Sequence, residues 1–449
     1  MKRGKIETRL DVNYNAPQYS ILVEKLHNTF GDRLKRIGEI ATVICGPFGS
    51  AIKSVDYRDT PGIPLIRIAN ISNDGYMDYS DLVYIDEQLG DSLSRTQVSQ
   101  GDIVISQRGS LGQCAVVDNQ FEKQNISANI IAIKQIKKTS APFIRDYLLS
   151  SIGQKLLERN ISGQVQPKIT TNDIENILLP MGCNEKEMSA LLQIARESYH
   201  HKFQQADGLL QSLGQHILEV LNINIKEPDS KLCSAIRLKD IKRAASLSVE
   251  YFHPERMMAL HALRENPSFA VKPLSEAVDF FRDIVNSADS PEKYLGLAGV
   301  ESHTGELTNI DEEADGQAFS YETNDVLYGR LRPYLNKVLL AEKEGICSTE
   351  FHVMRVKNGA KLLPEYLAEI MRSDLILSQT KHMMTGNTHP RISNNDVKNL
   401  CIPIPSISVQ QRIINEIASK RNKARALREE AEIEWTTAKQ EFEKELLGE

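Results

Sequence analysis

The chain has 449 residues, 41% of them hydrophobic and 25% charged, which is typical of a globular protein with two or three domains. It has no apolar run long enough to cross a bilayer, no signal-peptide pattern at residues 1–10, and six scattered cysteines without a C-x-x-C pair. We therefore expect no membrane association, no disulfide framework, no zinc knuckle, and a reducing cytoplasmic location. The net charge of −6 argues against a generally basic nucleic-acid binder but allows local basic faces.

Two copies of one segment organise the chain. Residues 162–181 (SGQVQPKITTNDIENILLPM) match residues 385–405 (TGNTHPRISNNDVKNLCIPIP), and the paired prolines Pro167 and Pro390 are 223 positions apart. Each copy leads through a further proline into a long helical pattern. Because twice this offset is nearly the whole chain length, the sequence predicts a tandem repeat of one unit, made of a globular head, a proline exit and a long helix.

A second match marks where each unit begins. Residues 9–17 (RLDVNYNAP) are echoed by residues 246–254 (SLSVEYFHP), so the units begin near residues 9 and 246. We expect a mixed α/β fold. The predicted division is a first head at 1–183, a central spacer helix at 184–225, a connector at 226–245, a second head at 246–405 and a C-terminal spacer helix at 406–449.

The two heads differ most between Leu34 and Gly101. The offset between matching residues falls there from 237 to 223, so the second unit is shorter by 14 residues. Little matches in this region except a short apolar strand, at residues 63–71 in the first unit and 292–300 in the second. Because the frame is kept while the loops vary, we infer that the frame is structural and that the loops discriminate between ligands.

Beyond the variable region the sequences of the two heads correspond segment by segment. Residues 100–117 and 323–340 each hold two β-like runs around a polar turn, which predicts a hairpin. Asp102 matches Asp325, and Gln113 matches Asn336. Further strands are predicted at 126–136 and 347–356, and helices with apolar residues at three- and four-residue spacing at 141–162 and 362–385.

The helix after each proline exit carries a narrow apolar seam of the heptad kind. Lys202 interrupts the first seam, and Lys420 and Glu434 interrupt the second. Such a seam needs a partner helix, and the economical partner of each helix is the other. We therefore expect the two helices to pair antiparallel, with one head at each end. The seam residues that we single out are Leu192, Ala195, Tyr199, Leu213, Ile413, Ile417 and Leu427.

Catalytic motifs are missing from the sequence. Residues 46–54 (GPFGSAIKS) look like a phosphate-binding loop, but that loop needs Gly directly before the Lys, and Ile52 stands there. The segment is either a glycine-rich turn that brings Lys53 near a DNA backbone or a plain solvated turn. We find no H-E-x-x-H, no serine elbow, no convincing carboxylate pair and no Gly-rich cofactor loop, so we expect no catalysis by this chain alone.

Basic and amide side chains recur at matching places on the first hairpin and at the proline exit of both units. Arg, Lys, Gln and Asn are the residue types that read base edges and hold phosphates. The alternative is that such residues are simply common in loops, or that Pro-Lys and Pro-Arg cap a shared frame. The candidate DNA-binding residues are Lys53, Arg67, Gln107, Arg108, Gln164, Gln166, Lys168, Arg330, Arg332, Asn387, His389 and Arg391.

The layout resembles the specificity subunit of type I restriction–modification enzymes. The matching features are the two G-x-x-x-P-[KR]-I-[ST]-x-x-D-[IV] segments, the opening at 46–54, and the GDIVISQRG and NDVLYGRLRP hairpins, which together cover nearly the whole chain. The resemblance implies two target recognition domains with pseudo-two-fold symmetry, separated by two long antiparallel coiled-coil-like helices. Each domain would read one half of an asymmetric, split DNA site.

The resemblance also implies partners. The long helices would dock two methyltransferase subunits, which bind S-adenosylmethionine and methylate adenine at N6 in double-stranded DNA. The sequence leaves open whether a restriction subunit that uses ATP and Mg²⁺ also joins. The chain itself would hold no cofactor and no metal. A helix over residues 185–221 would be roughly 55 Å long at ~1.5 Å per residue, or about one to one and a half turns of B-DNA.

Three other hypotheses stay open. The chain could be a stand-alone methyltransferase or nuclease, against which the missing cofactor loop argues. It could be a two-headed scaffold that does not bind DNA. It could also be the specificity subunit of a methylation-only or type II-like two-subunit system.

The pairing of heads with half-sites predicts how single substitutions act. Arg108→Ala should weaken recognition of one half-site only, and Arg391→Ala recognition of the other only, as measured by methylation of DNA libraries in which one half is randomised. An equal loss on all sequences would instead identify these arginines as phosphate contacts.

Overall fold

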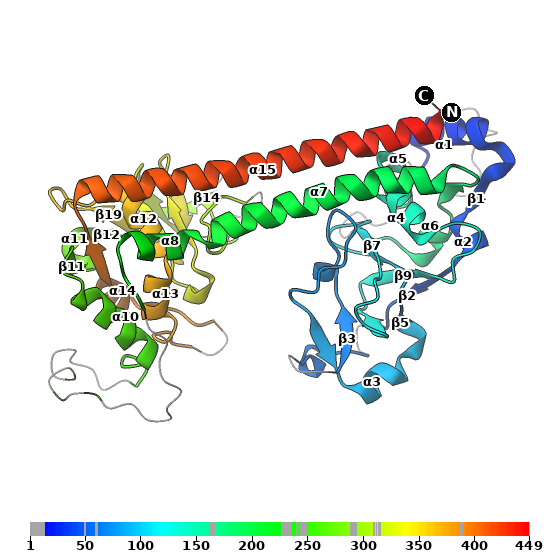
Figure 1. Cartoon of the computed structure of the whole chain (residues 1–449). Helices are drawn as coiled ribbons and strands as arrows, with labels where there is room; N and C mark the ends of the chain where they lie inside the picture. The colour runs from blue at the N-terminus through cyan, green and yellow to red at the C-terminus, as the bar shows by residue number, and fades with distance from the viewer. Residues whose placement is uncertain are drawn as a thin grey trace. The chain divides into compact units, whose positions relative to one another are not determined.

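The computed structural model describes residues 14–448 except 49–50, 59–61, 162–166, 226–235, 237, 239–240, 242–248, 288–293, 309, 311, 313–315 and 387–388. The chain divides into two compact units, Met1–Phe203 with Arg428–Glu449, and Gln204–Leu427. Both units mix helices and strands, which confirms the predicted fold class (Figure 1). None of the described helices is long and apolar enough to cross a membrane.

The first unit contains two four-stranded sheets, a two-stranded ribbon and their covering helices. Its strands are β1 Leu34–Arg36, β2 Thr42–Cys45, β3 Ile63–Ile66, β4 Val83–Ile85, β5 Gln97–Val98, β6 Ile103–Ser106, β7 Cys114–Val116, β8 Gln124–Ile126, β9 Ile130–Lys134 and β10 Leu178–Pro180. Its helices are α1 Pro17–Phe30, α2 Ile37–Ile40, α3 Glu87–Ser92, α4 Ala141–Leu149, α5 Ser151–Asn160 and α6 Thr171–Glu175, followed by α7 Glu185–Gln211. The sheet orders are β2-β9-β6-β7 and β4-β3-β8-β5, with β1 paired to β10.

The second unit repeats this plan. Its strands are β11 Ala270–Pro273, β12 Val278–Phe281, β13 Ile284–Asn286, β14 Tyr294–Leu295, β15 Gln317–Tyr321, β16 Val326–Gly329, β17 Val338–Leu340, β18 Gly345–Ser348, β19 Phe351–Val356 and β20 Cys401–Ile404. Its helices are α8 Leu213–Val220, α10 Pro254–Glu265, α11 Leu274–Ala277, α12 Pro364–Arg372, α13 Asp374–Thr380 and α14 Asn394–Lys398, followed by α15 Ile407–Leu447. The sheet orders are β12-β19-β16-β17 and β13-β15-β18-β14, with β11 paired to β20.

The first sheet of each unit is buried on both faces. In the first unit Ile103 and Ile105 of β6 belong to the apolar cluster that contains the helices, whereas Val104 between them belongs to a second cluster with Ile66 of β3. Because side chains alternate across a strand, this is the pattern of a sheet packed between helices on one face and another sheet on the other. The predicted hairpins are confirmed as β6–β7 and β16–β17.

The second sheet is where the two units diverge. Three strands correspond, because β3 and β14 pair parallel with β8 and β18, which in turn pair antiparallel with β5 and β15. The fourth strand is added at opposite edges, since β4 pairs with β3 whereas β13 pairs with β15. The length difference predicted between Leu34 and Gly101 therefore accompanies a change in the edge of this sheet.

The strands predicted at 126–136 and 347–356 need correction. Each range holds the end of one strand and all of the next, because the chain crosses from the second sheet to the first at a short turn between β8 and β9, or between β18 and β19. In the first unit the amide of Ile130 donates to the carbonyl of Ser127 and closes this turn (3.1 Å). Apolar periodicity continues across the turn because both strands are buried, so it hides the break.

The helices predicted at 141–162 and 362–385 are each two helices. Ser150 between α4 and α5 has an extended backbone, and its hydroxyl accepts from the amide of Gly153, so it ends one helix and caps the next. Ser373 takes the corresponding place between α12 and α13. A side chain on Gly153 would put its Cβ only 2.1 Å from the carbonyl oxygen of Tyr147, so the tight corner requires glycine.

The long helices pair within each unit. In the first unit α7 runs antiparallel to α15, since Ser198 contacts Glu434 (2.9 Å) and Lys202, further along α7, reaches back to Glu430 (2.9 Å). Lys202 also binds Glu434 (2.7 Å), so two charges that interrupt the seams in the sequence neutralise each other. The central spacer helix predicted as continuous to residue 221 breaks at Ser212, between α7 and α8.

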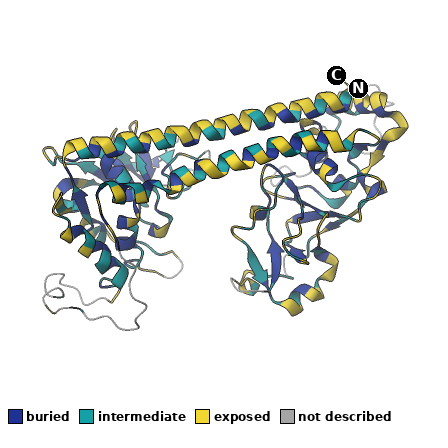
Figure 2. Ribbon diagram, in the orientation of Figure 1, coloured by how far each residue is buried: buried dark blue, intermediate teal, exposed yellow. Residues whose placement is uncertain are grey.

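Buried and exposed residues alternate along the long helices (Figure 2), and the singled-out seam residues are buried or partly buried. Leu192 and Tyr199 are buried with Trp435 of α15, and Ala195 is partly buried beside them. In the second unit Leu213 is buried with Ile413 and Ile417, and Leu427 is partly buried.

Charges placed in the seam should destabilise the unit that receives them. Leu192→Asp and Ile417→Asp bury an unpaired carboxylate at sites that are 0% and 1% exposed, so we expect each to lower the free energy of unfolding by at least about 3 kcal/mol and to abolish binding of helical partners. Thermal unfolding and co-purification measure the two effects. Ile194→Asp and Ile433→Asp, at 71% and 67% exposure on the same helices, are the matched controls for the unfolding measurement. Equal stability of Leu192→Asp and its control would contradict the seam.

Candidate nucleic-acid interface

The proline exit of the first unit is hydrogen-bonded to the end of the hairpin strand β6. The amide of Ile169 donates to the carbonyl of Gln107 (3.2 Å), and the amide of Gln107 donates to the carbonyl of Asn129 (2.8 Å). These bonds bring three distant parts of the chain together: the hairpin turn, the start of β9 and the proline exit. We call this meeting point the junction of the unit.

The second unit has the same junction built from different side chains. The amide of Ile392 donates to the carbonyl of Arg330 (3.0 Å), and the amide of Arg330 donates to the carbonyl of Glu350 (2.8 Å). A further bond runs from the amide of Arg332 to the carbonyl of Pro390 (2.7 Å). The backbone frame is therefore repeated while an amide pair, Gln107 and Asn129, is replaced by a charged pair, Arg330 and Glu350.

The predicted residues of the first junction differ in exposure. Gln107 is buried, and its side-chain amide donates to the sulfur of Cys45 (3.7 Å), so it supports the frame. Arg108, the next residue, is exposed, and Lys168 is half-buried. Of the predicted residues at this junction, Arg108 and Lys168 thus reach the surface, and Gln164 and Gln166 lie outside the described residues.

The second junction is organised by Glu350, which the sequence reasoning missed. Its carboxylate binds the guanidinium of Arg391 (2.7 Å) and lies 3.8 Å from that of Arg330. The hydrogen bond to Glu350 raises the pKa of Arg391, which stays charged. Arg332 and His389 are exposed, and Arg332 has a left-handed backbone (φ 48°), while Asn387 lies outside the described residues.

Part of the opening segment 46–54 lines a cavity of about 420 Å³ next to the first junction. Pro47, Phe48 and Ile52 come from this segment, Arg67 follows β3, and Asn129 belongs to the junction itself. Gly46 allows the approach, because a Cβ there would lie 2.0 Å from the carbonyl oxygen of Ser127. The structure therefore brings Arg67 and the glycine-rich opening to the same side of the junction.

Two predicted basic residues around this cavity have different surroundings. Arg67 binds the carboxylate of Asp81 (2.9 Å), which neutralises part of its charge. Lys53 is exposed, and its amide donates to the carboxylate of Asp56 (2.7 Å) in a short turn. Phe48, on the rim of the cavity, is 90% exposed.

The matched aspartates of the two hairpins have a structural role. Asp102 accepts from the amide of Ser99 (3.0 Å), and Asp325 accepts from the amide of Glu322 (2.8 Å), so each closes the turn before its strand. Asp325 also binds Arg355 of the neighbouring strand (2.7 Å). The recurrence of these residues therefore reflects the shared frame and carries no indication of a ligand.

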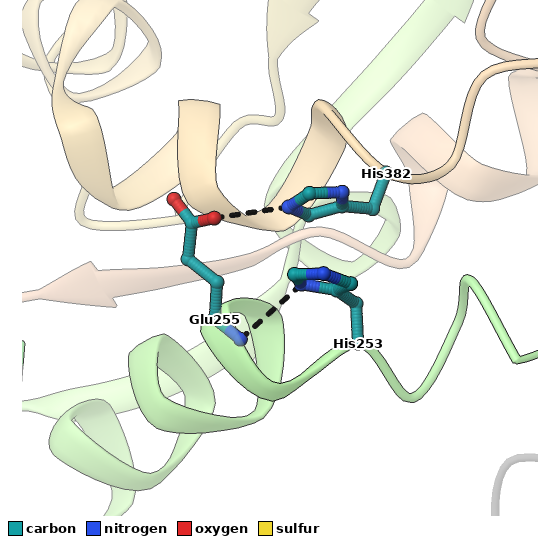
Figure 3. Close-up of side chains that lie close together, drawn as sticks. All are labelled: His253, Glu255 and His382. Carbon is teal, nitrogen blue, oxygen red and sulfur yellow. Dashed lines mark hydrogen bonds and ion pairs between the residues drawn. The ribbon is translucent and has the colours of Figure 1, made fainter. Parts of the chain in front are cut away.

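One His-Glu-His group stands out in the second unit (Figure 3). The donor atoms of His253, Glu255 and His382 lie within 4.8 Å of one another. However, the two imidazole rings are stacked face to face at 3.3 Å, so their in-plane lone pairs do not converge on one point. Glu255 already binds His382 (2.9 Å) and Lys381 (2.6 Å), and His253 caps α10, so the group joins α10 to α13 rather than fitting a metal ion.

His352 lies on β19 beside the second junction and is 4% exposed. Burial, and then the nearby charges of Arg330 and Arg282, lower its pKa to about 3. The ring is therefore neutral at physiological pH. The second junction consequently contains a buried neutral imidazole next to a charged guanidinium, and protonation would add a second positive charge beside Arg330.

Comparison with known sequences gives one family. Residues 33–186 and 294–432 match the family described as the type I restriction modification DNA specificity domain. The chain is 23% identical over 148 residues to the EcoDI specificity subunit and 24% identical over 169 residues to the EcoBI specificity subunit, both type I restriction enzyme subunits of Escherichia coli. These matches cover 31% and 37% of this chain and span about a third of each relative, 32% and 34%.

Comparison with solved structures gives matches along most of the chain. A chain from a structure on complex assembly and conformational transition of the type I R-M system is 15% identical, with coverage of 92% of this chain and 96% of that chain and a TM-score of 0.45. The type I S subunit from M. genitalium is 11% identical, with coverage of 92% and 95% and a TM-score of 0.39.

The depressed pKa of His352 predicts a pH dependence of stability. The unfolded state takes up a proton near pH 6.5 and the folded state only near pH 3, so stability is full above 6.5 and falls by up to about 1.4 kcal/mol per pH unit below it. Thermal unfolding between pH 7 and 5 should show this slope. His352→Phe keeps an aromatic ring against Tyr328 and should flatten the slope, whatever its absolute stability. An unchanged slope would contradict the assignment.

Proposed function

Because this chain belongs to the family of type I restriction modification DNA specificity domains, we propose that it reads an asymmetric, bipartite DNA site, one half with each unit. The chain is a recognition subunit of such a system and has no catalytic role of its own. Each junction, with the loops around it, would contact one half-site.

The observation that carries this proposal is the repeated junction with exchanged side chains. Both units use the same backbone bonds to hold a hairpin turn, a strand start and a proline exit, but Gln107 and Asn129 occupy in one unit the positions that Arg330 and Glu350 occupy in the other. A frame of this kind positions different hydrogen-bonding groups in the same way. Two unlike junctions are what an asymmetric site requires, since identical heads would read a symmetric one.

The charges at the junctions support a division of roles, in which some side chains bind DNA phosphates and others contact base edges. Exposed Lys53 and Arg332 are suited to phosphates, which bind any exposed cation without regard to sequence. Arg391 is already paired with Glu350, and a paired guanidinium and carboxylate offer donors and acceptors in a fixed arrangement. Such a pair suits base edges, where Arg donates to guanine and Glu accepts from cytosine.

Partners follow from the same proposal. We assign two methyltransferase subunits to the long helices, with S-adenosylmethionine bound by those subunits, and ATP and Mg²⁺ bound by a restriction subunit where one is present. Exposed Ile194 on α7 and Ile433 on α15 offer apolar contact on helices whose opposite faces are buried.

The first experiment is to express the chain with its methyltransferase partner and to map methyladenine across the host genome by single-molecule sequencing. We expect one split motif with two unlike halves. Exchanging residues 1–180 for the matching segment of another family member should change one half and leave the other half and the spacer unchanged.

The swap has clear contrary outcomes. A change in both halves would mean that the units do not read independently. Absence of methylation in cells that contain a stable complex would contradict DNA recognition and favour a scaffold. The unswapped chain, expressed in the same cells, is the control for expression and assembly.

A further inference from the structure

Each unit has a tight turn in its variable region that packs against an arginine of the head. The turns read Ser72-Asn73-Asp74-Gly75 and Ser302-His303-Thr304-Gly305, and both glycines have positive φ, +88° and +71°. A Cβ on Gly75 would lie 2.8 Å from Cδ of Arg145, and a Cβ on Gly305 would lie 2.4 Å from Nε of Arg372. The two turns are therefore equivalent, although the sequence around them differs.

In the first unit this turn is tied to a long helix through a buried arginine. Arg196 of α7 is fully buried and donates to the backbone carbonyl of Asp74 and to the carboxylate of Asp146 on α4 (2.6 Å). Arg145 donates to the same carboxylate oxygen (2.8 Å). Asp74, Arg145, Asp146 and Arg196 form what we call the first latch.

Two aromatic rings lie near the guanidinium of Arg196 in the first latch. The guanidinium of Arg196 lies 5.0 Å from the ring of Trp435 on α15 and 5.9 Å from that of Tyr76, which follows the turn. Gln193, one helical turn earlier on α7, donates to the hydroxyl of Tyr76 (2.8 Å). The variable turn, the head helix α4 and both long helices thus meet at one guanidinium.

The second unit contains a matching second latch, formed by Glu306, Glu369, Arg372 and Arg421. Arg421 of α15 donates to Glu306, directly after the turn, and to Glu369 of α12, both at 3.1 Å. Arg372 binds Glu369 (2.7 Å). Although burial raises the pKa of Glu369, Arg372 and Arg421 hold it below its usual value, so the carboxylate is charged.

Each latch joins a head-helix carboxylate, a second arginine and a long-helix arginine to the variable turn, which contributes the backbone carbonyl of Asp74 in the first latch and the carboxylate of Glu306 in the second. Asp146 and Glu369 are the sixth residues of α4 and α12. Arg196 and Arg421 do not correspond in the repeat, since the position that matches Arg196 at the offset of 223 is Ser419. Each unit therefore places a long-helix arginine between a head-helix carboxylate and the variable turn, but the arginine comes from a different long helix in each unit. The presence of the link in both units indicates that it is required.

We infer that Arg196 and Arg421 are positioning residues that fix each recognition head on its long helices and so set the spacing between the two half-sites that the chain accepts. This inference rests on the proposed function. A guanidinium that bridges two partners constrains both distance and angle, because its donors form a rigid planar fork. The residues of the single helix α15 belong to both units. The orientation of a head on this helix therefore affects the length of the DNA spacer that the chain accepts between the two half-sites.

The sharpest variant is Arg421→Met. It removes the bridge but leaves no carboxylate unpaired, because Glu369 keeps Arg372 and Glu306 keeps Arg425 (3.5 Å). The matched control is Arg425→Met, which removes the same charge one helical turn away. Arg425 also contacts Glu306, but its side chain is 61% exposed. Thermal unfolding of both variants checks that the fold is kept.

The measurement uses the full chain with its methyltransferase partner and DNA duplexes that carry the mapped half-sites. The spacer has its natural length or is one base pair longer or shorter. For Arg421→Met we expect the preference for the natural spacer to fall about two- to thirtyfold, as for other mutations that weaken coupling between sites, while Arg425→Met keeps it. Arg196→Met combined with Asp146→Asn tests the first latch, since the amide oxygen can still accept from Arg145.

The outcomes separate the two proposals. A merely structural role would lower methylation of all duplexes alike and leave the spacer preference unchanged, which would overturn the latch. An unchanged preference in Arg421→Met with a normal fold would do the same, even if the first-latch variant failed to fold. If the unsubstituted complex methylates no split site, the proposed function fails before the latch is tested.

Discussion

Burial of the seam between the long helices is the interaction on which both units depend. The core of the first unit contains Leu192 of α7 and Phe442 of α15 together with Phe143 of the head, and the core of the second contains Ile217 of α8 and Ile413 of α15 together with Tyr366. An isolated helix with a narrow apolar stripe is marginal in water, and these helices are stabilised by tertiary packing. They are thus integral to the folded heads, and any partner that binds them acts on surfaces continuous with the two cores.

The features that were predictable from the sequence are those with local or repeated signals. The seam, the hairpins and the tandem repeat follow from periodicity and from a constant offset, and the fold class follows from them. The breaks at Ser150, Ser373 and Ser212 were missed because buried apolar positions continue across them. The pairing of β4 and β13 at opposite sheet edges depends on contacts between distant segments, which no local pattern records.

The candidate site was also only partly predictable from the sequence, because it too depends on contacts between distant segments. Gln107 and Arg330 were singled out as ligand-binding side chains, yet Gln107 is buried in the frame and Arg330 shares Glu350 with Arg391. Glu350 has no signal of its own in the sequence, because its importance comes from two arginines that approach it from other strands and loops. A carboxylate between two arginines weakens their indiscriminate attraction to phosphates.

The path of α15 has a consequence for how the protein is made. Ala431, Trp435, Ala438 and Phe442, close to the C-terminus, complete the core around α1, α4 and α7 of the first unit. During synthesis the N-terminal head therefore leaves the ribosome long before the residues that close its core exist. The core of this head stays incomplete while the second unit is translated, so premature termination anywhere before α15 would leave both heads with incomplete cores. The nascent chain therefore needs protection from aggregation until α15 emerges.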